Sequence, residues 1–435
     1  MYLVYSALLV IGLVVTLPYW IYQMARRGKY RVGFRERFGA VPDRLTRGKD
    51  GPAIWIHAVS VGEVLAVTSL AEALRSRWPA FEVYVSTTTD TGQNLARARF
   101  GADHVFYFPI DLGFAIRPYL ERLRPQLMVI AETEFWPNVL RLAKRSGARV
   151  AVVNARLSDR SLAGYKRLGW WLPSVLAQVD LFLAQSGEDR KRLLEIGAPE
   201  ARVAVTGNLK FDLKPGPEPE VVAKLRESLR AEGAGPVLVC GSTVDDEEER
   251  MLLQAFQSIL ASYPKAVMVL APRHPERFAP VAGLVESFGT RFLRRTLWSG
   301  EPLAGSILLL DTIGELSAIY GVADIAFVGG SLVPKGGHNI IEPARHGVAI
   351  VIGNHYENFR DIIGLFQGQR AVRVAGPAEF PLVLMELIAN ETERRAMGRR
   401  AAETLQSQTG ATEKTLAALE PLLGGEVPSA REAAR

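Results

Sequence analysis

The alternation of short β-branched segments with helical ones constrains most strongly how this chain can fold. In the first half, strand-like segments begin near residues 53, 81, 127 and 149, and helical patterns follow the first three. In the second half, such segments begin near residues 236, 265, 306, 324 and 349, with helical patterns after the first and fourth. Strands that alternate with helices imply parallel sheets covered on both faces. The pattern therefore predicts an α/β chain made of two doubly wound, Rossmann-like halves.

A proline-rich segment, residues 214–220, marks the boundary between the halves. Its prolines at positions 215, 217 and 219 exclude a helix and favour an extended linker. The length of 435 residues also exceeds what one hydrophobic core usually serves. We predict a membrane anchor over residues 1–25, an N-terminal domain over 26–213, a C-terminal domain over 214–424 and a polar tail over 425–435.

Composition narrows the class of protein further. Hydrophobic residues make up 48% of the chain and charged residues 23%, with a net charge of +6, which excludes a disordered, fibrous or many-pass membrane protein. The single Cys240 can form no internal disulfide and leaves no cysteine cluster for zinc or iron–sulfur chemistry, so a reducing cytoplasm is the expected setting. The six histidines lack ligand spacing and there is no D-x-D pair, so we predict no metal.

The N-terminal segment Tyr2–Ile21 is almost wholly apolar, and the first charged residue is Arg26. About 20 such residues span a bilayer core as a helix, and a cleaved signal peptide would carry basic residues ahead of the run. Aromatic residues at 19–22 suit a membrane interface, and the basic residues between 26 and 37 favour the cytoplasmic side. Those basic residues are either a solvated stop signal or a surface for anionic lipid. We predict one uncleaved transmembrane anchor in the cell inner membrane with a cytoplasmic body; the alternative is a buried core helix.

Polar side chains follow the strands of the first half. Ser60 and Glu63 have the spacing of a helix capping box, although Glu63 could instead act as a general base. Glu132 and Glu134 share one strand face, so both could be chemical groups or both capping groups. Lys210 is either a solvated lysine or a group that neutralises developing negative charge. Doubly wound domains bind ligands outside the carboxyl ends of their strands, so we expect these residues to face a central cleft.

The second half carries features that suit a phosphate. Arg273 follows the strand that begins near residue 265, and its planar guanidinium can bind two phosphate oxygens. Residues 329–342 are glycine-rich and lie between a strand and a helix, so bare backbone N–H groups could converge on a phosphate. They match neither the dinucleotide fingerprint nor the P-loop. The acidic run at 245–249 is more typical of a helix N-terminus, which favours negative charge, than of a cation site. For Asp311 and Glu315 a helix N-terminus is the structural alternative to a role in the site.

Together these motifs resemble those of the 3-deoxy-D-manno-octulosonic acid (Kdo) transferases, also called lipid IVA Kdo transferases. The resemblance rests on HAVSVGE, AETEFWPN, NARLSDRS, TGNLKFD, APRHPERF and GGSLVPKGGHNIIEPA, which occur in the family's order. It implies a GT-B fold of two Rossmann-like domains. It also implies an inverting, metal-independent transfer of Kdo from CMP-Kdo to the anionic lipid A precursor, lipid IVA, in lipopolysaccharide core biosynthesis. The implied partners are the donor, the acceptor and membrane lipids, with no cofactor and no nucleic acid.

The same resemblance assigns roles to residues. It makes Glu63 the general base and makes Glu132 and Lys210 the stabilisers of the transition state. It places the following residues in the CMP pocket: Pro272, Arg273, Gly314, Glu315, Leu316, Asn339, Ile340, Ile341 and Glu342. The family often has Pro-Leu where this chain has Ile340 and Ile341, a departure that removes no charged group.

Two other functions are compatible with the sequence pattern. A sugar-nucleotide epimerase would share the two-domain fold, but soluble sugar nucleotides require no membrane contact, so the apolar N-terminus argues against it. A non-catalytic, membrane-tethered binding module is the other alternative. The presence of Glu63, Glu132, Lys210 and Arg273 argues against that module.

Overall fold

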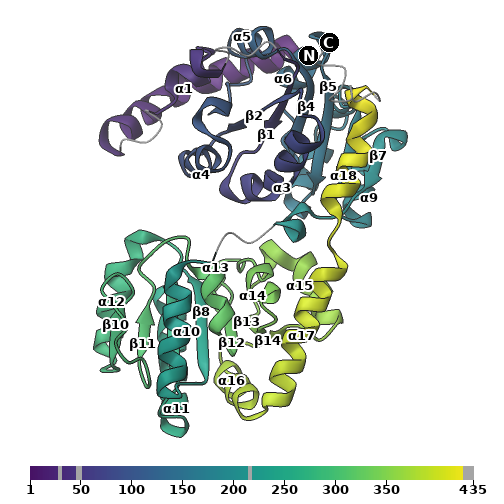
Figure 1. Ribbon diagram of the computed structural model, residues 1–435. Coiled ribbons are helices and arrows are strands. Elements are labelled where there is room, and N and C mark those ends of the chain that lie inside the picture. The colour runs from purple at the N-terminus through teal and green to yellow at the C-terminus, as the bar shows by residue number, and fades with distance from the viewer. Residues whose placement is uncertain (28–31, 46–50, 214–217, 425–435) are drawn as a thin grey trace, which may run out of the picture. The chain divides into compact units, whose positions relative to one another are not determined.

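The computed structural model describes residues 1–27, 32–45, 51–213 and 218–424, and the chain in it forms two compact units (Figure 1). One unit comprises Met1–Lys214 and Gln408–Arg435, and the other comprises Pro215–Ser407. The predicted linker residues 214–217 and the predicted tail 425–435 lie outside the described residues, as do Lys29 and Arg31 of the basic cluster.

The first unit is built on a parallel sheet of seven strands in the order β3-β2-β1-β4-β5-β6-β7. Its strands are β1 (Ala53–His57), β2 (Glu82–Thr87), β3 (Val105–Tyr107), β4 (Pro125–Ala131), β5 (Arg149–Ala155), β6 (Leu181–Ala184) and β7 (Val203–Val205). Its helices are α1 (Tyr2–Arg27), α2 (Phe34–Arg37), α3 (Val61–Arg77), α4 (Asp90–Phe100), α5 (Gly113–Leu123), α6 (Pro137–Arg145), α7 (Asp159–Lys166), α8 (Leu172–Leu176), α9 (Gly187–Glu195) and α18 (Ala411–Leu419).

Helices cover both faces of this sheet, which is why its central strands are largely apolar. In β1 the side chain of Trp55 joins the core on one face, with Tyr119 of α5 and Leu140 of α6. Ile54 and Ile56 join the core on the other face, which includes residues of α3, α4 and α18. Successive strand residues point to opposite faces, so a strand buried on both sides presents apolar residues to both of them.

The second unit repeats this plan with strand order β10-β11-β9-β8-β12-β13-β14, again all parallel. Its strands are β8 (Val237–Thr243), β9 (Val267–Pro272), β10 (Phe292–Arg294), β11 (Ile307–Leu309), β12 (Ile325–Val328), β13 (Ala349–Ile352) and β14 (Arg373–Val374). Its helices are α10 (Glu220–Glu232), α11 (Asp246–Ser262), α12 (Phe278–Ser287), α13 (Leu316–Ile319), α14 (Ile341–Arg345), α15 (Arg360–Gly368), α16 (Phe380–Ala389) and α17 (Glu391–Ser407). The predicted α/β class with two doubly wound sheets is confirmed.

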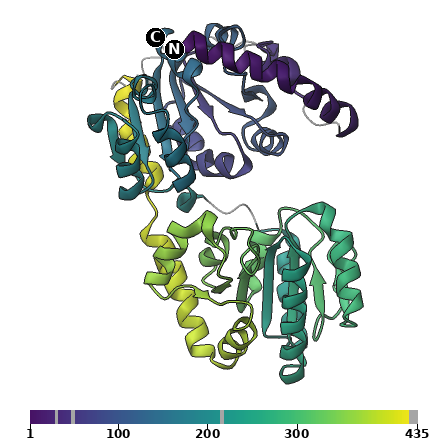
Figure 2. The same cartoon turned by 180° about the vertical axis from the view of Figure 1, so that it is seen from behind.

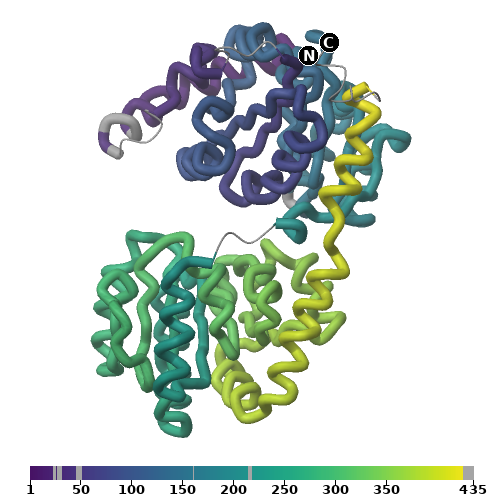
Figure 3. The backbone as a smooth tube through the Cα atoms, viewed as in Figure 1, coloured from purple at the N-terminus to yellow at the C-terminus, as the bar shows by residue number. Residues whose placement is uncertain are grey.

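The C-terminal residues depart from the boundaries drawn from sequence. Residues 408–424, assigned there to the second domain, pack against the first unit, to which the yellow C-terminal segment returns in Figure 3. Ala411, Leu416 and Leu419 join the core beneath α3, and the Asp212 carboxylate accepts hydrogen bonds from Gly410 N and Thr412 N. The return is made at Gln408–Gly410, which lacks the proline signal of the first crossing, so composition did not mark it.

Strand order locates where each unit can bind a ligand. In the first sheet the order reverses at β1 and β4, and in the second it reverses at β8 and β12. Ligands of doubly wound sheets bind beyond the carboxyl ends of the strands at such a switch point. Glu63 follows β1 and Glu132 follows β4, whereas the glycine-rich loop follows β12.

One glycine of that loop is required by the close approach of backbone to backbone. A Cβ added to Gly329 would lie 2.5 Å from the carbonyl oxygen of Ser242, at the end of β8. Because a side chain at this position would push the two strand ends apart, glycine keeps the switch point of the second sheet closed.

Candidate active site

Glu63 lies in the first turn of α3 and is almost completely buried, with 8% of its surface exposed. Its Oε2 accepts a hydrogen bond from Val59 N (2.8 Å), and its Oε1 accepts one from the Ser60 hydroxyl (3.0 Å). Ser60 occupies the N-cap position, but its side chain accepts no backbone N–H. The reciprocal capping box is therefore absent, since that motif needs the N-cap oxygen to accept a hydrogen bond from the helix.

The surroundings of Glu63 favour its protonated form. Burial, together with the nearby negative charges of Glu132 and Glu134, raises the pKa of Glu63 to about 7 against the opposing hydrogen bonds from Val59 N and Ser60. Burial also raises the pKa of Glu134, with Glu132 contributing in the same direction. A carboxyl whose pKa lies near neutrality can release and accept a proton at physiological pH.

Glu132 and Lys210 form an ion pair beside this carboxyl group. Lys210 Nζ lies 2.9 Å from Glu132 Oε1, and each side chain is about a quarter exposed. Glu132 follows the last residue of β4 and adopts a positive φ of 56°, which is uncommon for a residue with a side chain. The hydrogen bond from Glu132 N to Val153 O (2.9 Å) and the ion pair with Lys210 hold the residue in this conformation. Strained residues of this kind are often found at functional sites.

Two asparagines that were not singled out from sequence position Lys210. The Oδ1 of Asn208 accepts a hydrogen bond from Lys210 N (3.0 Å), and the Oδ1 of Asn154 accepts one from Leu209 N (2.9 Å). Asn154, at the end of β5, is fully buried and also has a positive φ of 53°. Its place in the NARLSDRS motif was visible in the sequence, but its partner lies 55 residues away, so its role was not.

The first unit thus gathers Glu63, Glu132, Glu134 and Lys210 at its switch point. Three carboxyl groups and one ammonium group, partly shielded from water, can take up a proton and balance charge without a further cofactor. His57, which precedes this cluster, plays a different part. It is fully buried and stacked on Phe108, and burial lowers its pKa to about 3, so it is neutral and serves as a packed core side chain.

In the second unit, predicted site residues lie at the ends of β9 and β12. Arg273 directly follows β9, is exposed, and donates its backbone N–H to Thr243 O (2.8 Å). Burial raises the pKa of Glu342, while the nearby charges of Arg273 and Arg345 lower it. Burial and the charge of Arg273 lower the pKa of His338 to about 4. Arg273, His338 and Glu342 therefore lie within electrostatic reach of one another.

His338 is a candidate ligand-binding residue that sequence reasoning did not assign. Its Nε2 is buried and has no hydrogen-bond partner in the described part of the chain, and its ring packs over Gly330. A buried polar atom normally has a partner. A ligand group beside Arg273 could supply the one that His338 lacks.

The backbone N–H groups at the start of the glycine-rich loop are not available to a phosphate. Glu248, buried in the first turn of α11, accepts hydrogen bonds from Gly330 N (2.9 Å), Ser331 N (3.1 Å) and Leu332 N (3.2 Å). This corrects the expectation that bare N–H groups converge there on a ligand. The carboxylate of Glu248, from the same unit, instead holds the start of the loop through these hydrogen bonds. This fixes the backbone position from which the following residues continue.

The other predicted pocket residues are placed as follows. Ile340 and Ile341 are buried, so only their backbone could meet a ligand, and Asn339 Oδ1 already accepts from Ile341 N (3.1 Å). Glu315 pairs with Arg295 (2.7 Å) and accepts from the Thr312 hydroxyl. Gly314, exposed with a φ of 94°, forms the turn before Leu316 opens α13, and Pro272 ends β9.

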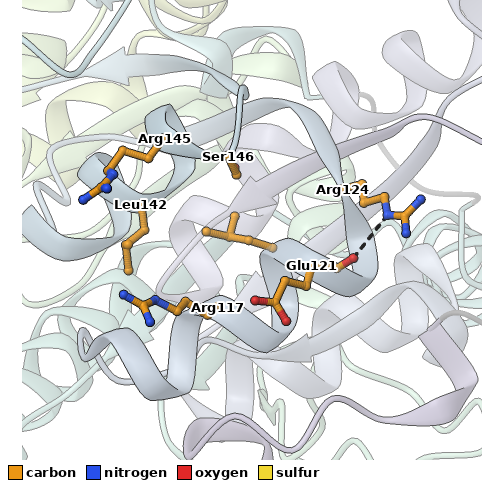
Figure 4. A pocket seen from close by; sticks show the side chains of 7 residues that line it. Arg117, Glu121, Arg124, Leu142, Arg145 and Ser146 are labelled. Atoms are coloured by element: carbon orange, nitrogen blue, oxygen red, sulfur yellow. Dashed lines mark hydrogen bonds between the residues drawn. The ribbon is translucent and has the colours of Figure 1, made fainter.

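A separate surface pocket lies between α5 and α6 in the first unit and contains none of these residues (Figure 4). It is lined by Arg117, Leu120, Glu121, Arg124, Leu142, Arg145 and Ser146. Three guanidinium groups against one carboxylate make it cationic. Across the residues that the structure describes, no three His, Cys, Asp or Glu side chains are grouped so as to hold a metal ion.

Comparison with known proteins decides what kind of enzyme carries this site. Residues 32–213 match the family described as 3-deoxy-D-manno-octulosonic-acid transferase (kdotransferase). The chain is 35% identical over 401 residues to the 3-deoxy-D-manno-octulosonic acid transferase of Haemophilus influenzae, covering 91% of this chain and 92% of that one. The chain belongs to the Kdo transferase family. It is a glycosyltransferase, which removes the epimerase and the non-catalytic module from consideration.

Solved structures of other enzymes share the fold of this Kdo transferase. A glycosyltransferase from Rickettsia africae has a TM-score of 0.58 at 13% identity, covering 87% of this chain and 100% of that chain. The UDP-GlcNAc 2-epimerase of Neisseria meningitidis has a TM-score of 0.56 at 12% identity, covering 85% and 100%. These neighbours confirm the GT-B type of architecture. Since transferase and epimerase are matched alike, the fold alone does not distinguish them.

Proposed function

We propose that this Kdo transferase moves Kdo from CMP-Kdo to the lipid A precursor, lipid IVA, with inversion and without a metal. Two arguments support the proposal. The family fixes the sugar, and the cluster of Glu63, Glu132 and Lys210 supplies a proton acceptor and a balancing charge. The observation that carries the mechanism is the burial of Glu63 at the switch point with a pKa near 7.

In the proposed reaction, Glu63 takes the proton of an acceptor hydroxyl as that oxygen attacks the anomeric carbon of Kdo. The new carbon–oxygen bond forms while the bond from that carbon to the CMP phosphate breaks, and its electron pair leaves with CMP. Glu132 and Lys210 stabilise the charge that develops between these events. Because attack and departure occur on opposite sides of the anomeric carbon, its configuration inverts.

The proposed CMP-binding residues lie in the second unit. Arg273, together with His338, would meet the phosphate, since an arginine fork binds two oxygens and the neutral imidazole offers an unused nitrogen. The remaining contacts are assigned to Pro272, Gly314, Glu315, Leu316, Asn339, Ile340, Ile341 and Glu342. Buried Ile340 and Ile341 would contribute backbone groups only.

The site of action is proposed to be the cytoplasmic surface of the inner membrane. Helix α1 contains the segment Tyr2–Tyr22, which is long and apolar enough to cross a membrane, with a mean hydropathy of 2.0. An apolar segment of this kind would hold the enzyme beside its lipid acceptor, and basic residues such as Arg26 and Arg35 would contact anionic head groups.

The direct test is the Glu63→Gln variant, assayed with CMP-Kdo and lipid IVA. Loss of the proton acceptor should lower turnover by about two to four decades. The matched control is Glu72→Gln, an exposed carboxylate on the same helix, which should retain wild-type turnover. Near-normal turnover of folded Glu63→Gln would refute the assigned base, and failure of the wild-type protein to modify lipid IVA would refute the acceptor.

A further inference from the structure

The first turn of α1 is docked on the first unit. The rings of Tyr2 and Tyr5 lie 5.8 and 5.7 Å from the ring of Trp171, which precedes α8. The Ser6 hydroxyl accepts a hydrogen bond from Asn138 Nδ2 (2.9 Å) at the start of α6. This contact combines aromatic packing with a specific hydrogen bond, so it fixes both the position and the rotation of the helix.

Buried polar groups of the unit are organised around this contact. Asp111 and Asn138 are 2% and 1% exposed. Asp111 accepts hydrogen bonds from Asn138 N (3.0 Å) and Val139 N (2.7 Å), and its side chain also bonds the Tyr5 side chain. The same carboxylate thus caps α6 and holds α1. Removing α1 would leave partners in this network unsatisfied, which is costly for buried groups.

The other end of α1 leads back into the same unit through α2. Glu36 of α2 accepts a hydrogen bond from Tyr107 N (2.9 Å), and Arg37 donates one to Thr88 O (2.6 Å). Arg27 and Val32 are five residues apart, a span of at most about 18 Å for an extended chain. Both ends of α1 are therefore tied to one unit, and Figures 1 and 2 show the helix lying along its outside.

From this geometry we infer that α1 does not cross the bilayer but lies along it, embedded in the cytoplasmic leaflet. A helix of 26 residues is about 39 Å long, and crossing a hydrocarbon core of about 30 Å would put its ends on opposite sides. Residues 2–6 would then be separated by the bilayer from Trp171 and Asn138, which they contact. The inference rests on the proposed location at the membrane and specifies how the helix sits there.

The occupant of the exposed face of α1 is lipid. Leu3, Leu8, Ile11, Val14 and Val15 are all more than half exposed, and the segment Tyr2–Tyr22 carries no charged side chain that would favour water or an ionic partner. Beside the docked first turn, Trp170 of the globular unit is 69% exposed. An indole side chain at this level suits the membrane interface.

Positive charge next to the docking point complements an anionic membrane. Arg141 of α6 lies with its guanidinium 4.3 Å from the centre of the Tyr2 ring. Arg145, one turn further along α6, joins Arg117 and Arg124 in the cationic pocket of Figure 4. Residues four apart on a helix lie on one face, so Arg145 and its pocket lie next to Arg141 and the N-terminal turn of α1. The pocket can therefore receive an anionic lipid head group.

A cross-linking experiment tests the docking. The variant Tyr2→Cys/Arg141→Cys, in native membranes, should be joined by a short bismaleimide, whereas Val15→Cys/Arg141→Cys should not, because Val15 lies about 20 Å further along the helix. The native Cys240 is fully buried and contributes little background. A folded, active Tyr2→Cys/Arg141→Cys enzyme that does not cross-link would overturn the inference while leaving the proposed transfer intact.

A labelling experiment distinguishes a helix in the plane from one that crosses. A membrane-impermeant maleimide added to spheroplasts should leave Leu3→Cys unmodified, while a known periplasmic cysteine protein in the same cells is labelled. Labelling of Leu3→Cys from the periplasm would show a crossing helix.

Binding to anionic vesicles should fall at least tenfold in Leu8→Glu/Ile11→Glu but not in the control Leu297→Glu, an exposed leucine of the second unit. If the wild-type protein instead formed a soluble dimer and did not bind vesicles, the occupant of the exposed face of α1 would be a second copy of the chain.

Discussion

At the scale of single residues, the proposed chemistry depends on what raises the pKa of the Glu63 carboxyl group to about 7. Glu63 is buried near other carboxylates, and two local hydrogen-bond donors, Val59 N and the Ser60 hydroxyl, oppose its protonation. Lys210 is directed instead at Glu132. The lysine therefore balances the neighbouring acid and leaves Glu63 with a high proton affinity, as its proposed role of general base requires.

The pH dependence of transfer should report this carboxyl group. Because the proposed base Glu63 would have to be ionised to accept a proton, kcat/KM should rise with pH along a limb centred near pH 7. Replacing Glu134 with glutamine removes a like charge and should move that limb to lower pH by about half a unit. An unshifted limb in folded Glu134→Gln would show that the two carboxyls do not interact. Glu72→Gln is the control.

Stability should vary with pH in the opposite sense from an ordinary surface carboxylate. The pKa of Glu63 is raised from 4.5 to about 7 in the folded state, so the folded chain holds this proton more tightly than the unfolded chain. The contribution of protonated Glu63 to the free energy of unfolding is therefore fully present below about pH 4.5, and it is lost as the pH rises through about 7. Glu63→Gln should therefore be more stable than wild type at pH 8, by up to about 3 kcal/mol, and equally stable near pH 4.5. Denaturant unfolding at the two pH values measures the difference.

At the scale of elements, the sequence predicted the longer buried strands and the helices that follow several of them, but not how the elements meet. The short strands β3, β6, β10 and β14 were not predicted. The strands at 53–57 and 267–272 could be recognised because strands buried on both faces are mostly apolar. Glu248 was read only as part of an acidic helix start, since its three N–H partners lie more than 80 residues along the chain. The charge pattern placed it correctly at the start of α11, while its partners depend on strand order, which local sequence does not encode.

The hydrogen bonds between Glu248 and the glycine-rich loop lead to a testable prediction about these elements. Glu248→Gln keeps the shape but turns an amide donor toward backbone donors, which should destabilise the second unit by about 2–4 kcal/mol. Amide hydrogen exchange at residues 330–332 should accelerate, and CMP should bind more weakly. Glu247→Gln, an exposed neighbour on the same turn, is the control. Unchanged exchange in folded Glu248→Gln would contradict this role.

At the scale of the whole molecule, the chain crosses between its two units twice. The proline-rich crossing near residue 214 was predicted from composition, but the return at Gln408–Gly410 was not. Sequence prediction of the site was also partial: candidate residues were predicted, but their contacts were not. Glu63, Glu132 and Lys210 were predicted as candidates because each lies after a strand. The structure brings Glu63 and Glu132 together because β1 and β4 are neighbours at the switch point, and Lys210, which follows β7, reaches Glu132 through an ion pair. The departure at α18 arises because an amphipathic helix can cover any apolar face within reach of its linker.

The packing of α18 predicts which unit a C-terminal mutation destabilises. Leu419 is fully buried in the core beneath α3, so Leu419→Ala should cost about 2–5 kcal/mol and should accelerate amide exchange in β1 and α3 of the first unit. Leu405 of α17 is also buried but belongs to the second unit, so Leu405→Ala should accelerate exchange there and leave β1 unchanged. If Leu419→Ala instead affected the second unit alone, α18 would belong where the linker pattern first placed it. The two leucines lie 14 residues apart in sequence, so a clean separation of their effects would locate the return crossing between them.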